Sequence, residues 1–303
     1  MKTVLIGGGT GLVGARLSLM LEEKGYKVLH LSRRQNLSDR FPAYAWDPLK
    51  GTIDMEALGK ADVIINLAGA GIADARWTEK RKQLIIDSRV KSTRLLKTAI
   101  QKCGARPEAF ISAAAVGFYG DRGEEILTEV SAPGNGFLSE SCVEWEKAIA
   151  EPVVEQLRTV WLRIGIVLSA KGGALEKILI PVRFGIGGYF GDGRQWYSWI
   201  HLDDLCRMFI YALENKELEG VFNAVAPAPV RNKDLVIATG TALGKSLLMI
   251  PGPEFAMRLA MGEMADTIFS STRVSADKIR QTGFSFNFPE LLPAISDLVK
   301  RKI

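Results

Sequence analysis

Residues 3–14 read T-V-L-I-G-G-G-T-G-L-V-G, and this stretch decides the fold that the sequence predicts. Thr3 to Ile6 form a short apolar run rich in β-branched residues, which favours a buried strand. Glycines then recur at a spacing of three, and residues 15–24 have the pattern of a helix that ends before Gly25. Strand, glycine-rich turn and helix in this order are typical of a dinucleotide-binding βα unit.

In such a unit the glycine-rich turn binds the pyrophosphate of the dinucleotide. Glycines allow the tight turn, let the phosphates approach the backbone amides, and let the helix pack closely on the strand. The helix N-terminus adds free N–H groups and a partial positive charge. A glycine-rich turn without a ligand is the alternative. We predict contacts to the pyrophosphate from the turn and the first helical residues, which are Gly8, Thr10, Gly11, Leu12, Val13 and Gly14.

The end of the second expected strand, at 28–31, bears on the choice of nicotinamide cofactor. NAD enzymes usually present Asp or Glu here to the ribose 2′-hydroxyl. This chain instead has Ser32, Arg33 and Arg34, and its next acidic residue is Asp39. Guanidinium groups suit a 2′-phosphate, because they grip it with paired N–H donors. We therefore predict NADP(H) bound by these three residues, with ordinary surface charges as the alternative for the two arginines.

Strand and helix patterns alternate through the first half of the chain. The further segments expected are strands at 44–46, 61–68, 109–115 and 160–168, and helices near 79–102 and 140–156. This alternation predicts an α/β fold, a Rossmann-type doubly wound parallel sheet with helices on both faces. Ligands of such sheets bind at the carboxyl ends of the strands.

The character of the sequence changes after Ser169. Glycines interrupt the pattern between 172 and 193, and prolines punctuate the chain from Pro227 onward. Residues 201–213 between them read as a helix capped by Asp203. We expect two parts: an NADP-binding domain of residues 1–169, to which 201–225 return, and a smaller α+β C-terminal lobe of 170–200 and 226–303 that covers the substrate.

The composition excludes several other classes of protein. The hydrophobic content is 47%, and no apolar run reaches the length of a membrane span, so we expect no membrane segment. No leader pattern precedes the first expected strand, so we expect no signal segment. The net charge of +5 is too mild to indicate a nucleic-acid-binding protein. The 3 scattered cysteines fit free thiols in the cytoplasm, and 2 histidines without a Cys/His cluster indicate no metal site.

Several motifs in this order resemble the extended short-chain dehydrogenase/reductase superfamily, and more narrowly its atypical epimerase-like family 39U. They are G-G-T-G-L-V-G (8–14), W-D-P (46–48), N-L-A-G-A (66–70), V-G-F-Y-G (116–120), L-R-I-G-I-V-L (162–168) and G-D-G-R-Q-W-Y-S-W-I-H-L-D-D (191–204). The last third resembles that family's C-terminal domain. The resemblance implies an epimerase-like oxidoreductase acting on a small molecule, which a nucleotide could carry, and a homodimer formed by the helices at 79–102 and 137–156.

The resemblance also implies further cofactor contacts at the carboxyl ends of three expected strands. They are Asp47 near the adenine, Asn66, Leu67, Ala68 and Gly69 on the adenosine side, and Ser112 and Ala113 near the nicotinamide.

The usual acid–base pair of this superfamily is absent from the sequence. In the superfamily a Tyr exchanges the proton, and a Lys four residues later lowers the pKa of that Tyr. Phe137 and Ser141 stand at the expected positions, and no Tyr in the chain is followed by Lys at this spacing. A phenyl ring cannot exchange a proton, so the usual mechanism cannot be assigned.

Three other residues are candidates for the catalytic step: Tyr119, His201 and Ser112. Each has a purely structural role as its alternative. Two functions therefore stay open. The first is an NADP(H)-dependent epimerase-like oxidoreductase with an unusual proton donor, which the covering lobe favours. The second is an NADP(H)-binding sensor or regulatory protein without turnover, which the missing pair favours.

Overall fold

The computed structural model describes residues 1–152 and 157–300, and within them one large sheet organises the molecule. Its strand order is β13-β8-β6-β5-β1-β2-β3-β4, and every neighbouring pair is parallel except β3 with β4. The order reverses at β1, which confirms the predicted doubly wound fold. In chain order the strands are β1 (Thr3–Gly7), β2 (Lys27–Ser32), β3 (Ala43–Asp47), β4 (Thr52–Ile53), β5 (Val63–Asn66), β6 (Ala109–Ala115), β8 (Arg158–Ile164) and β13 (Gly220–Ala224).

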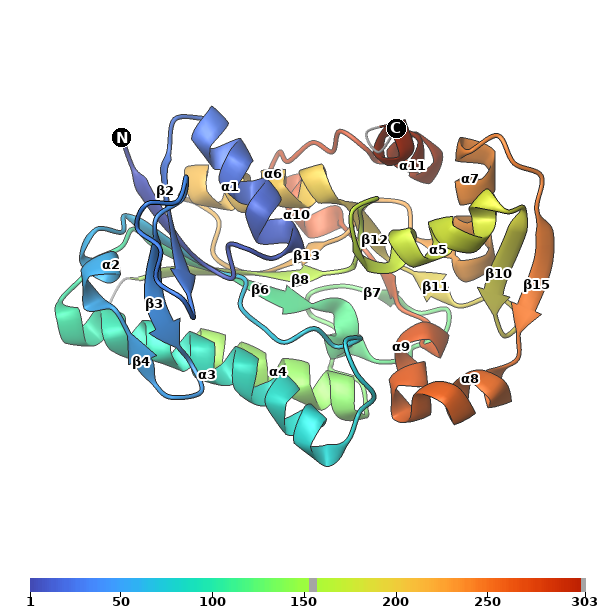
Figure 1. The fold of residues 1–303 in the computed structure, drawn as a ribbon, viewed down its shortest axis with the longest axis horizontal. Helices are drawn as coiled ribbons and strands as arrows, with labels where there is room; N and C mark the ends of the chain where they lie inside the picture. Colours follow the sequence, from blue (N-terminus) through green and yellow to red (C-terminus); the bar gives the residue numbers. More distant parts are fainter. Residues whose placement is uncertain (153–156, 301–303) are drawn as a thin grey trace.

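Helices cover both faces of this sheet, as Figure 1 shows. On one face lie α1 (Leu12–Glu23), α6 (Leu202–Glu214) and α10 (Asp277–Gln281), and on the other α3 (Glu79–Cys103) and α4 (Phe137–Ala150), with α2 (Met55–Gly59) near the β4 edge. Successive strand residues serve opposite faces. Val4 and Ile6 pack with Leu17 of α1, whereas Leu5 packs with residues of α2 and α3.

The rest of the described chain gathers at the end of the molecule that lies to the right in Figure 1. Its short strand pairs are β9 (Ile166–Leu168) with β12 (Trp199–His201), β10 (Ile186–Phe190) with β15 (Leu248–Gly252), β11 (Trp196–Tyr197) with β14 (Val230–Arg231), and β7 (Ile126–Leu127) with β16 (Arg273–Val274). Its helices are η1 (Val116–Tyr119), α5 (Gly173–Arg183), α7 (Asn232–Ala242), α8 (Glu254–Met261), η2 (Gly262–Ala265), α9 (Asp266–Phe269) and α11 (Leu291–Lys300).

The single strand predicted at 160–168 is wrong. The chain forms two strands, and it breaks at Gly165 so that β9 leaves the large sheet and pairs with β12. A Cβ at Gly165 would collide with the Ser198 carbonyl oxygen and lie 2.9 Å from Val225 Cγ1. The break therefore depends on the close approach of the backbone at Ser198 to Gly165. The local pattern of residues 160–168 gives no sign of this contact.

Three helix boundaries also differ from the prediction. The first helix begins at Leu12 and not at residue 15. The helix predicted at 140–156 begins at Phe137 and ends at Ala150, while residues 153–156 lie outside the described part of the chain. The cap of α6 is His201 and not Asp203, because His201 Nδ1 accepts the Asp203 N–H at 3.0 Å.

None of the helices in the described ranges combines the length and the apolar character needed to cross a lipid bilayer.

Candidate cofactor site and adjoining cavity

The glycine-rich turn joins β1 to α1 at the carboxyl edge of the large sheet. Gly8 has a φ of +81°, and a Cβ there would lie 2.9 Å from the carbonyl carbon of Leu67. A Cβ on Gly14 would collide with the Gly8 carbonyl oxygen and lie 2.7 Å from Gly9 Cα. Both positions therefore require glycine, because the turn, the helix and the loop after β5 approach closely there.

The N-terminus of α1 is open to an anion. Its cap residue is Gly11, which provides no side-chain hydrogen bond, and its first turn contains no acidic residue. In α3, by contrast, the Thr78 side chain accepts from the Arg81 N–H at 3.2 Å, and Glu79 lies in the first turn. An uncapped helix start leaves N–H groups and the positive end of the helix dipole for a ligand. These residues thus fit a pyrophosphate.

The ring of His30 packs against this turn, and the sequence did not predict this contact. Its buried ring lies so close to the turn that a Cβ on Gly9 would be 2.5 Å from His30 Nε2. That nitrogen lies 2.8 Å from Ser18 Oγ, which donates to the Gly14 carbonyl at 2.7 Å. Burial lowers the pKa of His30. The signal in the sequence was Gly9, the additional glycine of G-G-G, whose missing side chain makes room for the ring.

Strand register brings the other predicted cofactor residues to the same edge. Gly7 of β1 is level with Asn66 of β5, which is level with Ser112 of β6. Buried Asn66 donates to Thr93 Oγ1 at 3.1 Å and accepts from the Ala68 N–H at 3.2 Å. Asn66 therefore orients the loop that continues through Leu67, Ala68 and Gly69. Gly11, Leu12, Val13 and Ala113 lie at the same carboxyl ends or on the helix that follows β1.

The residues at the ends of β2 and β3 differ in how their side chains are engaged. Arg33 and Arg34 are exposed, and neither forms an ion pair with another residue of the described ranges. Ser32 accepts weakly from the Arg34 N–H at 3.4 Å. Asp47 accepts from the Leu49 N–H at 3.0 Å and so stabilises its own turn. The two arginines are the groups at this corner with charge available for a ligand.

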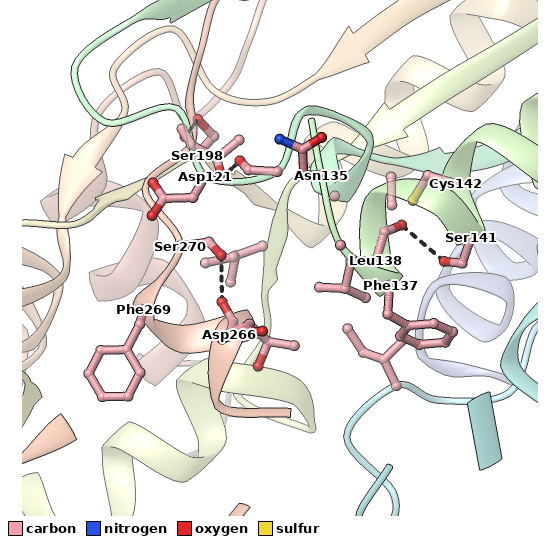
Figure 2. Close-up of a pocket in the computed structure, with 18 of the residues that line it drawn as sticks. Asp121, Asn135, Phe137, Leu138, Ser141, Cys142, Ser198, Asp266, Phe269 and Ser270 are labelled. Atoms are coloured by element: carbon pink, nitrogen blue, oxygen red, sulfur yellow. Dashed lines mark hydrogen bonds between the residues drawn. The ribbon is translucent and has the colours of Figure 1, made fainter. Parts of the chain in front are cut away.

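A cavity of about 380 Å³ adjoins this edge, between the start of α4 and the segment around α9. Figure 2 shows Phe137, Leu138, Ser141 and Cys142 on one side, and Asp121, Asp266, Phe269 and Ser270 on the other. The lining also includes Trp77, Arg89, Ala115, Asn135, Trp196, Tyr197 and Arg258. Residues far apart in the sequence thus form one chamber.

Phe137 and Ser141, where the resemblance predicted the Tyr and Lys of the superfamily, both line this cavity. Phe137 packs edge-on against Trp77, with ring centroids 4.9 Å apart. Ser141 donates to the Leu138 carbonyl at 3.0 Å. Cys142 beside them is buried, and burial raises the pKa of its thiol to about 12, so the thiol is neutral.

The three candidate catalytic residues are not among the described residues that line the cavity. Tyr119 is fully buried; its hydroxyl donates to Asn223 Oδ1 at 2.7 Å and accepts from Arg163 Nη1 at 2.9 Å. Burial raises the pKa of Tyr119. Ser112 donates to the Ala113 carbonyl at 2.9 Å. The structure thus gives these hydroxyls partners inside the fold.

His201 lies at the junction of β12 and α6. Its Nδ1 accepts the Asp203 N–H, which places the ring proton on Nε2, 3.2 Å from Asp297 Oδ2. Its ring stacks on Phe288 with centroids 4.0 Å apart. This arrangement connects the start of α6 to α11.

A buried ion pair joins α4 to β8 of the large sheet. Arg163 of β8 donates twice to Glu146 of α4, with both distances 2.8 Å, and its guanidinium lies 3.6 Å from the Phe118 ring centroid. Burial lowers the pKa of Arg163, but its hydrogen bonds and charge interactions with Glu146 and Tyr119 together outweigh this and leave the pKa raised. The pair therefore stays charged and fixes the helix that carries Phe137 and Ser141.

Comparison with known families matches residues 4–224 to the NAD dependent epimerase/dehydratase family. The chain belongs to this family. The match ends at the last residue of β13, and a domain of unknown function, DUF1731, matches residues 253–298. The family resemblance inferred from the sequence motifs is confirmed.

Relatives of this epimerase-family chain are similar over nearly its whole length. Epimerase family protein YfhF of Bacillus subtilis is 38% identical over 96% of each chain. Epimerase family protein SDR39U1 of Mus musculus is 36% identical and covers 98% of this chain and 99% of its own. The crystal structure of human SDR39U1 (isoform 2) with NADPH matches at a TM-score of 0.89 and 32% identity, over 98% of this chain and 99% of that one.

Proposed function

We propose that this protein binds NADP(H) along the carboxyl edge of its large sheet and acts as an epimerase-like oxidoreductase on a small molecule held in the adjoining cavity. The observation that carries the proposal is the uncapped start of α1, behind glycines that have no room for a Cβ. Exposed Arg33 and Arg34 at the end of β2 support NADP(H) over NAD(H). The human SDR39U1 structure with NADPH agrees with this choice.

Each group of residues has a distinct task in this proposal. The amides of Leu12, Val13 and Gly14 bind the pyrophosphate, and the arginines bind the 2′-phosphate. Asn66 holds the loop beneath the adenosine half. The bound cofactor supplies hydride chemistry. The cavity positions the second reactant and excludes water.

We assign the cofactor to residues 1–169 with 201–225, and the covering lobe to 170–200 and 226–303. The pairing of β13 with β8 supports the return of the second segment. Contacts beside the cavity support the covering role. Lys82 Nζ lies 2.5 Å from Glu263 Oε2, and Arg76 Nη2 donates to the Leu259 carbonyl at 3.3 Å.

We assign no proton transfer to Tyr119, His201 or Ser112, since each is engaged in hydrogen bonds within the fold. The absent Tyr–Lys pair also supports a second candidate function, an NADP(H)-binding sensor or regulatory protein without turnover. Phe137 and Ser141, at the positions of that pair, carry this alternative.

Calorimetry with NADPH and NADH tests the cofactor assignment. We expect NADPH to bind at least about tenfold more tightly, since one charge-assisted contact is worth about 1.5–3 kcal/mol. A screen of carbonyl compounds and nucleotide sugars that follows NADPH absorbance then separates the two functions. Turnover of any compound supports the enzyme, whereas tight cofactor binding without turnover, together with a partner captured only in the presence of NADPH, supports the regulator.

We also propose a cytoplasmic homodimer. Free Cys103, Cys142 and Cys206 support the reducing compartment. The outer faces of α3 and α4 are the proposed contact surface, and light scattering on the purified protein measures the mass.

A further inference from the structure

Aromatic side chains from separate elements form the walls of the 380 Å³ cavity. Trp77, which precedes α3, packs against Phe137 of α4. Phe269 of α9 lies across the cavity from Phe137 in Figure 2, and Trp196 of β11 contributes to the lining. Ring faces and edges at several points of one chamber favour a ligand that is itself planar and unsaturated.

The first cation of the lining, Arg89, is already used by the fold. Its Nη1 donates to the carbonyls of Ala70 and Ile85, both at 3.0 Å, and its guanidinium lies 5.2 Å from the Trp145 ring centroid. Burial lowers the pKa of Arg89. This guanidinium supports the loop after β5, and its donors at Nη1 are not available to a ligand.

The second cation, Arg258 of α8, is paired on both sides. Its Nε lies 2.7 Å from Glu254 Oε1, and its Nη1 lies 2.8 Å from Asp266 Oδ1. Among the described residues of the lining, Arg89 and Arg258 balance Asp121 and Asp266. The formal charge of the lining is therefore zero, so the lining has no excess positive charge to offset the charges of a diphosphate.

Next to the cavity, one carboxylate and one indole ring lie close to two arginines. Arg231 lies 2.8 Å from Glu124 and stacks over Trp196, with its guanidinium 3.8 Å from the ring centroid. Arg273 lies 4.7 Å from the same ring. Hydrogen bonds from Arg231 and Trp196 hold the pKa of Glu124 near 2, so this carboxylate stays charged between the arginines.

The remaining polar groups of the lining are neutral. Ser141 and Ser270 donate to backbone carbonyls, which leaves their oxygens as acceptors. Exposed Asn135 borders the same cavity, and its amide can donate to a carbonyl oxygen. These groups suit an uncharged polar atom on a ligand better than a phosphate.

We infer that the second ligand of this protein is a planar, electrically neutral molecule of the conjugated-carbonyl class, and not a sugar linked to a nucleoside diphosphate. The inference rests on the proposed function, because it takes this cavity as the substrate site beside NADP(H). It narrows the small-molecule substrate to compounds that stack between aromatic walls and bring no charge.

Calorimetry on the full chain tests this inference, first with NADPH alone and then with NADPH-saturated protein and three probes. The neutral probe is 2-acetylnaphthalene, its charged counterpart is naphthalene-2-sulfonate, and the nucleotide sugar is UDP-glucose. We expect the neutral ketone to bind at least about tenfold more tightly than either anion, because the lining offers no net positive charge to offset the loss of their hydration.

Two wall variants locate the binding site. Phe137→Ala and Phe269→Ala are each expected to weaken the ketone by about fivefold or more, since each removes an aromatic partner. Phe255→Ala is the control, because Phe255 of α8 is exposed and is not part of the lining. An unchanged NADPH affinity shows that each variant is folded.

The outcomes separate this inference from the proposed function. No heat with NADPH overturns both. If NADPH binds normally, any of three results overturns the inference alone. They are binding of the sulfonate or UDP-glucose as tight as that of the ketone, no binding of the ketone, and wild-type affinity for the ketone in both wall variants. The comparison of probes on wild-type protein decides the matter even where a variant fails to fold.

Discussion

The cofactor cradle and the neighbouring cavity are built in opposite ways. The cradle consists of consecutive residues, from β1 through the glycine-rich turn into α1, and its requirements are local ones of backbone conformation and close approach. The lining of the cavity comes from separate segments, which include Trp77 before α3, the start of α4, β11 and α9. A motif therefore predicts the first region, whereas the second exists only after distant segments have packed together.

The largest effect is expected for the buried ion pair between Arg163 and Glu146, which joins α4 to the large sheet. Arg163→Met leaves Glu146 charged and buried without its partner, and should lower the free energy of unfolding by about 3–5 kcal/mol. Urea denaturation measures the change. Arg94→Met is the control, because Arg94 and Glu151 form an exposed pair worth about 0–1 kcal/mol. Equal losses in the two variants would show that the buried pair does not hold α4.

A change in the cradle should act on cofactor binding. Gly14→Ala places a Cβ 2.7 Å from Gly9 Cα and forces α1 away from the turn. We expect NADPH to bind at least about a hundredfold more weakly, which corresponds to about 2.7 kcal/mol. Calorimetry gives the dissociation constant.

Gly25→Ala is the matched control for this prediction. Gly25 has a φ of +82°, but nothing lies within 4 Å of its Cβ position. Alanine there should lower stability by about 1–2 kcal/mol through backbone strain, without changing NADPH affinity. Similar NADPH affinities in the two alanine variants would contradict the close-packing requirement at Gly14.

The corner formed by Arg33 and Arg34 sharpens the comparison further. Its charges are neighbours in the sequence, whereas the 2′-phosphate that we propose they bind belongs to the cofactor. Arg33→Glu should weaken NADPH by about 10- to 100-fold and leave NADH nearly unchanged, because only NADPH carries the 2′-phosphate. Fluorescence titration with both cofactors measures the selectivity. Arg106→Glu is the control. It makes the same charge change on an exposed residue before β6, near the amino ends of the strands, and should alter neither affinity. A parallel loss for both cofactors in Arg33→Glu would point to unfolding.

The smallest effect concerns the ring beneath the cradle. Burial lowers the pKa of His30 below its usual 6.5, so the unfolded chain takes up a proton at a higher pH than the folded chain does. Stability from this group is thus complete above pH 6.5 and is lost as the pH falls below it, with a slope of at most about 1.4 kcal/mol per pH unit.

His30→Gln should flatten the stability curve below pH 6.5 relative to the wild type, as measured by denaturation at several pH values. Ser18→Ala removes the hydrogen-bond partner of the ring but keeps the titrating group, so it should retain the slope. Identical slopes in wild type and His30→Gln would show that the ring does not contribute.

Much of the fold could be predicted because its signals are local. The strand expected at 109–115 has those bounds in the structure, and the helix expected at 79–102 extends over Glu79–Cys103. The break at Gly165 and the cap at His201 could not be predicted in this way. The first depends on Ser198, and the second on how a ring nitrogen meets the backbone at the start of α6.

The sequence by itself determined the doubly wound sheet, the glycine cradle and the pair of arginines after β2, because each follows from the conformational preferences and charges of neighbouring residues. Only the tertiary structure decided where the aromatic walls meet, which cations are already engaged, and that Tyr119 lies in the interior and not at the cavity. Burial and ion pairing arise from residues brought together by packing, and no stretch of sequence contains them in advance.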